Sequence, residues 1–113
     1  MMKTILTVIF LLFSTGLFAE TDNSKAVWLD VRTTEEYAAG HIEGAINIPH
    51  NEIAQRIAEL DLDKATPIVL YCKSGRRAGI ALETLTNMGY SQVTNEGGYE
   101  AIKQKLADDN ERQ

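Results

Sequence analysis

The segment AVWLDVRTTEEYAAGHIEGAINIP, residues 26–49, predicts a strand, a short helix and a second strand in direct succession. Residues 26–31 form a nearly continuous apolar run rich in β-favouring side chains, which is typical of a strand buried on both faces. Thr33 or Thr34 is placed to cap the helix, and Glu36 lies three residues after Thr33, the spacing of a capping box. The segment therefore begins with the strand and helix alternation of an α/β protein.

The rest of the chain continues this alternation, with glycine or proline at most boundaries between elements. The predicted elements are the short helix, which Gly40 ends; a strand over 45–48, which Pro49 ends; a helix over 52–60, which Asn51 caps; a strand over 68–71, which Pro67 opens; a helix over 77–88, which Gly89 ends; a strand over 93–94; a turn at Gly97 and Gly98; a helix over 99–106; and a frayed polar tail over 108–113. Strands that alternate with helices predict a mostly parallel sheet covered by helices.

The N-terminus has the layout of a secretory signal peptide. Lys3 precedes an apolar run over residues 5–13, and the chain turns polar after Ala19. The run is shorter than the roughly 20 apolar residues that a membrane helix needs. We therefore expect cleavage after Ala19, although the large side chain of Leu17 leaves an uncleaved anchor or another cut site open. No cysteine follows the run, which excludes a lipoprotein.

Length and charge restrict the class of protein. The chain has 113 residues, 44% of them apolar, enough for one modest core, and we assign residues 20–107 to that single domain. Removing Lys3 from 11 basic against 16 acidic side chains leaves a formal net charge of −6. Such a domain is a poor match for nucleic acid or an anionic membrane surface. We expect a periplasmic protein without stable membrane association once the signal peptide is removed.

Cys72, the single cysteine, is the candidate nucleophile. It has no partner for an intramolecular disulfide in the oxidising compartment that a signal peptide implies. It follows the predicted strand over 68–71 and precedes a helix, and sites in open α/β sheets form beyond the carboxyl ends of the strands. The competing interpretation is a buried cysteine that acts as a small apolar residue at the end of a core strand.

The residues after Cys72 favour the thiolate and an anionic ligand. Gly75 lets the loop turn so that backbone N–H groups surround the sulfur, Ser74 adds a hydroxyl donor, and the following helix presents the positive end of its dipole. Three cations lie in the same stretch: Lys73, Arg76 and Arg77. Basic residues at a helix N-terminus oppose the dipole unless an anion is bound there.

A second polar feature lies at the end of the first predicted strand, where Asp30 and Arg32 flank Val31. A buried carboxylate needs a partner, and we expect Arg32 or a backbone N–H to supply it in a structural, supporting role. His41 and His50 are far apart in sequence, and no second cysteine or carboxylate cluster has the spacing of metal ligands. We therefore expect no metal and no cofactor.

Four segments together resemble rhodanese domains. Residues 30–49, DVRTTEEYAAGHIEGAINIP, are similar to the first signature of that family. The strand before Cys72, the Cys-x-x-Gly-x-Arg loop that ends at Arg77, and the sequence Gly97-Gly98-Tyr99 follow in the expected order. The resemblance covers nearly all of the chain after the leader. It implies a rhodanese-like fold, a small, mostly parallel sheet of four or five strands flanked by helices.

The resemblance also implies an activity, sulfur transfer from thiosulfate to cyanide or a thiol through a persulfide on the residue matching Cys72. The donor anion and the departing sulfite are then held by the loop residues Lys73, Ser74, Gly75, Arg76 and Arg77. A second hypothesis is a persulfide carrier that hands sulfur to a protein partner. Related phosphatases and arsenate reductases need an arginine six positions after the cysteine, where this chain has Ala78, and this disfavours both activities.

Overall fold

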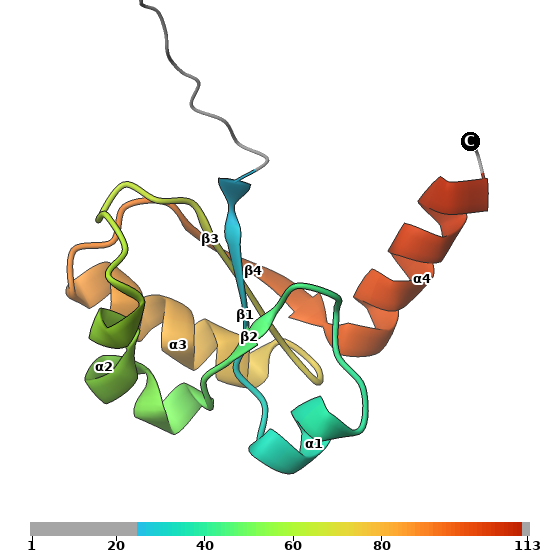
Figure 1. The fold of residues 1–113 in the computed structure, drawn as a ribbon, viewed down its shortest axis with the longest axis horizontal. Helices are drawn as coiled ribbons and strands as arrows, with labels where there is room; N and C mark the ends of the chain where they lie inside the picture. Colours follow the sequence, from blue (N-terminus) through green and yellow to red (C-terminus); the bar gives the residue numbers. More distant parts are fainter. Residues whose placement is uncertain (1–24, 112–113) are drawn as a thin grey trace, which may run out of the picture.

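The computed structural model describes residues 25–111, and the predicted signal peptide over residues 1–19 lies outside them. Four strands and four α-helices alternate along the chain, with two 3₁₀ turns flanking the second helix (Figure 1). The elements are β1 (Val27–Asp30), α1 (Thr34–Ala38), β2 (Ile46–Asn47), η3 (His50–Glu52), α2 (Ile53–Arg56), η4 (Ile57–Leu60), β3 (Ile68–Cys72), α3 (Arg76–Asn87), β4 (Val93–Gly98) and α4 (Tyr99–Glu111).

The four strands form one parallel sheet in the order β2-β1-β3-β4. Leu29 of β1 lies opposite Ile46 on one side and Leu70 on the other, so the first and third strands occupy the centre. Parallel neighbours require crossover connections, and each crossover carries a helix or helical turns. The predicted α/β fold with a small parallel sheet is confirmed.

The core has two parts, one on each face of the sheet. α2 and α3 cover the larger part, in which Leu29, Leu70 and Leu85 are fully buried. The smaller part lies on the other face, where Tyr71 packs with Ile102 of α4. Leu70 and Tyr71 point to opposite faces because side chains alternate along a strand. Each fully buried side chain of this size contributes about 1.5–3 kcal/mol to stability.

Several predicted helix boundaries differ from the structure, and the helix predicted over 52–60 is α2 followed by the 3₁₀ turn η4. The capping box of α1 is confirmed, since the Thr33 hydroxyl accepts from Glu36 N–H and the Glu36 carboxylate accepts from Thr33 N–H. The predicted cap at Asn51 is wrong, because a 3₁₀ turn has already begun at His50 and no side chain caps α2. The predicted helix end at Leu106 is also wrong, because α4 continues to Glu111.

The longer α4 and the longer β4 have physical reasons. No glycine or proline follows Leu106 to stop α4, and Gln104 donates a hydrogen bond to Asp108 one turn later. β4 includes Gly97 and Gly98 rather than ending before a turn. Within residues 25–111, no helix is both long enough and apolar enough to cross a membrane.

Gly98 allows β4 to lie against the loop that follows β3. Cys72 is the register partner of Gly98 across the two strands. A Cβ added at Gly98 would overlap the carbonyl oxygen of Lys73 and lie 3.4 Å from the Cα of Ser74. Both obstacles are backbone atoms, so the loop itself must move to admit a side chain.

We therefore expect Gly98→Ala to lower the free energy of unfolding by about 1–3 kcal/mol, the usual cost of overpacking. Gly79→Ala in α3 is the matched control, because the added methyl meets only the Asn95 amide at 3.7 Å. That control should be neutral or stabilising by up to about 1 kcal/mol, since alanine is the better helix former. Urea unfolding of both variants makes the comparison, and a fully stable Gly98→Ala protein contradicts the packing argument.

Candidate active site

Cys72 is the last residue of β3, and its side chain is 1% exposed. Its Sγ accepts hydrogen bonds from the backbone N–H of Gly75 at 2.9 Å and of Ala78 at 3.3 Å. Gly75 has a φ of +101°, the left-handed conformation that turns the loop back over the sulfur. α3 begins at Arg76, so its first turn also faces the sulfur. The N–H cradle predicted from the sequence is present.

Asn95 of β4 holds this loop from the far side, and the sequence analysis missed it. Its Nδ2 donates to the carbonyl oxygen of Gly75 at 2.9 Å, and its Oδ1 accepts from Gly97 N–H at 2.8 Å. Gly75, whose N–H donates to the sulfur, is thus hydrogen-bonded to β4. The sequence offered one signal for this role: Asn95 lies two residues before Gly97, and asparagine side chains often form hydrogen bonds with nearby backbone groups.

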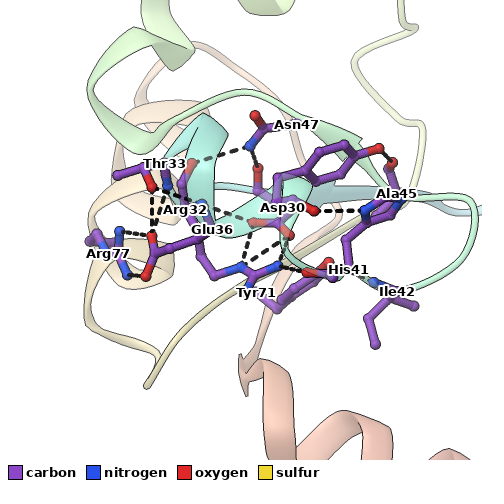
Figure 2. A network of polar contacts seen from close by, with 12 residues as sticks. Asp30, Arg32, Thr33, Glu36, His41, Ile42, Ala45, Asn47, Tyr71 and Arg77 are labelled. Atoms are coloured by element: carbon purple, nitrogen blue, oxygen red, sulfur yellow. Dashed lines mark hydrogen bonds and ion pairs between the residues drawn. The ribbon is translucent and has the colours of Figure 1, made fainter.

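Asp30 and Arg32 form a buried ion pair beneath the site, as expected from the sequence (Figure 2). The Arg32 Nη2 lies 2.6 Å from one Asp30 oxygen, and Nε donates to the other at 2.9 Å. Arg32 also donates to the carbonyl oxygen of Gly40 and packs 4.4 Å from the Tyr99 ring. The hydrogen bonds to Asp30 raise the pKa of Arg32, and burial is the main cause that raises the pKa of Tyr71.

Arg77 is bound to Glu36 in a two-pronged ion pair that links α3 to α1 (Figure 2). Its two terminal nitrogens donate to the two carboxylate oxygens at 2.8 and 3.0 Å. These bonds are the largest cause that lowers the pKa of Glu36 from 4.5 to about 2. From the sequence, Glu36 was predicted only as part of the helix cap, because Arg77 is 41 residues away along the chain. Lys73, Ser74 and Arg76 are exposed around the loop.

A hollow of about 290 Å³ lies beside the loop, and its walls include Lys73, Glu36, Arg32 and Tyr99. A larger hollow of about 430 Å³ lies next to Pro67 and Gln92, near the opposite ends of the strands. No charged side chain lines that larger hollow, whereas the smaller one contains Lys73, the residue that follows Cys72, so we take the smaller hollow as the candidate site. Among residues 25–111, no group of three or more His, Cys, Asp or Glu side chains converges on a metal-sized site.

The fold and the site define an α/β domain with a cysteine at a strand end and backbone N–H groups around its sulfur. Residues 16–105 match the rhodanese-like domain. An Escherichia coli protein named thiosulfate sulfurtransferase PspE is 42% identical over 102 residues, which cover 90% of this chain and 93% of that protein. The chain therefore belongs to the rhodanese-like domain family.

Solved structures agree with this assignment. A rhodanese with anions from E. coli is 45% identical and superposes with a TM-score of 0.64, covering 66% of this chain and 88% of that one. The human single-domain sulfurtransferase TSTD1 is 27% identical, with a TM-score of 0.65 over 74% of this chain and 85% of that one. Both cover most of the related chain, so the similarity extends over the domain rather than a fragment of it.

Asp30→Asn should lower the free energy of unfolding by about 3–5 kcal/mol, because it leaves the Arg32 charge buried without its counter-ion. Asp63→Asn is the matched control, since Asp63 is exposed and its one hydrogen bond, accepted from Ala65 N–H, survives the change. The control should change stability by no more than about 0.5 kcal/mol. Urea unfolding measures the free energy of unfolding of both variants. Equal losses would mean that the buried ion pair contributes no more to stability than an exposed carboxylate does.

The lowered pKa of Glu36 predicts a defined loss of stability in acid. The folded state favours the ionised carboxylate, so its contribution is fully present above pH 4.5 and is lost as the pH falls towards 2. Glu36→Gln lacks this titration, and the difference in melting temperature between wild type and variant should close across that window. Thermal unfolding between pH 7 and 2 tests this, and a difference that stays constant with pH contradicts it.

Proposed function

We propose that the enzyme carries sulfane sulfur from thiosulfate to cyanide or a thiol as a persulfide on Cys72. The chain is an enzyme of the thiosulfate sulfurtransferase class. The observation that carries the persulfide proposal is the pair of N–H groups, from Gly75 and Ala78, that donate to the Cys72 sulfur. Donors fixed around the Cys72 sulfur stabilise its thiolate, the form from which the first step starts and to which the second step returns.

In the first step the Cys72 thiolate attacks the outer sulfur of thiosulfate. The sulfur–sulfur bond of the donor breaks, and sulfite leaves with the electron pair of that bond. The products are a persulfide anion on the enzyme and free sulfite, so the total charge does not change. Lys73 and Arg76 are exposed beside the loop, where they would attract the dianion and balance its charge.

In the second step the acceptor takes the outer sulfur. Cyanide attacks that atom, the persulfide bond breaks, and the electron pair returns to the Cys72 sulfur as thiolate. A thiolate acceptor reacts in the same way and leaves as a persulfide. The same N–H groups serve both steps, because each step begins or ends with negative charge on the same sulfur.

The hollow that contains Lys73 is the proposed entry for the donor, because Lys73 directly follows Cys72. Its walls carry the cations of Lys73 and Arg32 as well as the carboxylate of Glu36. A relative was solved with anions, which supports an anionic donor for this chain as well. The N-terminal residues 1–19 fit an export signal, and we place the activity in the periplasm on that ground.

Intact-mass spectrometry tests the persulfide directly. Thiosulfate should add about 32 Da to the protein, the mass of one sulfur atom on a covalent nucleophile, and cyanide should remove it. Cys72→Ser is nearly isosteric and should keep the fold by circular dichroism while it neither gains mass nor transfers sulfur. A wild-type protein that gains no mass would indicate a carrier loaded by another protein, and full activity in Cys72→Ser would exclude the mechanism.

A further inference from the structure

The guanidinium of Arg77 is occupied by a carboxylate of the protein itself. Both terminal nitrogens donate to Glu36, one to each oxygen. Glu36 is in turn held by Thr33, whose backbone N–H and hydroxyl lie 2.9 and 3.1 Å from Oε1. The capping box of α1 therefore fixes the Glu36 carboxylate independently of its contact with Arg77.

This ion pair lies beside the sulfur site. Arg77 is the second residue of α3, between the two residues whose N–H groups donate to the Cys72 sulfur, and the charge of Cys72 is among the causes that raise the pKa of Arg77. Glu36 lines the hollow that also contains Lys73. The pair thus spans from α1 to the first turn of α3, at the edge of the space that a donor would enter.

An oxyanion needs the same part of Arg77 that Glu36 occupies. The guanidinium fork binds a carboxylate or another oxyanion through two parallel N–H bonds, and it cannot give both bonds to two anions at once. Glu36 remains ionised at neutral pH, because its pKa is lowered to about 2. A donor with a sulfonate-like face would therefore have to displace Glu36 or bind without Arg77.

We propose that Glu36 is a positioning residue that acts through Arg77, a resident competitor that weakens the binding of oxyanions at the Cys72 loop. This inference deepens the proposed function and rests on it only in naming thiosulfate and sulfite as the anions concerned. Weaker oxyanion binding raises the donor concentration that the enzyme needs. It also favours release of sulfite, which carries the same type of oxyanion face.

Four variants separate the contact from the charge. Glu36→Gln removes the charge and suits the capping box, which accepts glutamine at this position. Glu36→Asp keeps the charge but shortens the side chain, so that it no longer reaches Arg77 from its place in the cap. Glu35→Gln is the matched control, since Glu35 is exposed in the same helical turn. Arg77→Gln removes the contested group and is combined with Glu36→Gln.

The probe is sulfate, which has the oxyanion face but no transferable sulfur. Nuclear magnetic resonance titration at constant ionic strength follows the amide signals of Gly75 and Ala78 in the purified protein. We expect Glu36→Gln and Glu36→Asp each to bind sulfate about fivefold or more tightly than wild type, the gain expected when one charge-assisted contact becomes free. Glu35→Gln should stay within about twofold, the size of a screened surface-charge effect.

The gain in sulfate affinity should vanish in the Arg77→Gln background, because that variant has no guanidinium for which Glu36 and sulfate could compete. In turnover, Glu36→Gln should lower the KM for thiosulfate without raising kcat, since sulfite also leaves more slowly. An equal gain in the Arg77→Gln background would overturn the proposal, as would unchanged sulfate binding in both Glu36 variants. Sulfate binding needs no sulfur transfer, so a protein that forms no persulfide still allows this test, and the two proposals fail separately.

Discussion

The structure depends on the buried ion pair between Asp30 and Arg32. Asp30 is fully buried at the end of β1, and its carboxylate accepts the backbone and side-chain N–H groups of Arg32. Arg32 in turn reaches Gly40 after α1 and packs against the rings of Tyr71 and Tyr99. One guanidinium thereby links β1, the segment before β2, β3 and α4. Because both charges are out of water, neither partner is dispensable.

The cations near the sulfur differ in whether they already have a carboxylate partner. Arg32 is committed to Asp30, and Arg77 is committed to Glu36. Lys73 and Arg76 are exposed. The site therefore has backbone N–H groups that donate to the sulfur and exposed cations on the surface, whereas Arg32 and Arg77 are each paired with a carboxylate. In the proposed sulfur transfer, this arrangement would attract a small anion without holding it tightly, which suits an enzyme that must also release one.

Much of the fold followed from the sequence because its signals are local. Apolar runs, the capping box at Thr33 and the helix after Cys72 depend on residues within a few positions of one another. Errors arose where a local signal was overruled. Asn51 has the right type for a cap, but the chain after Pro49 had already entered a 3₁₀ turn. Gly97 and Gly98 suggested a turn but belong to β4, where Gly98 allows a close approach to the loop after β3.

The missed parts of the site are long-range contacts. Glu36 meets Arg77 across 41 positions, and Asn95 meets Gly75 across 20, so no spacing rule connects either pair. Both residues also have a local role, since Glu36 completes the cap of α1 and Asn95 accepts from Gly97 N–H. A domain this small has few polar side chains, and here one side chain makes both a local contact and a long-range contact. For Glu36 the capping box was visible in the sequence, and this sufficient explanation gave no reason to expect a second contact. Glu36 and Asn95 each combine a local bond with a long-range bond to the segment after Cys72, and only the fold brings the partners of the second bond together.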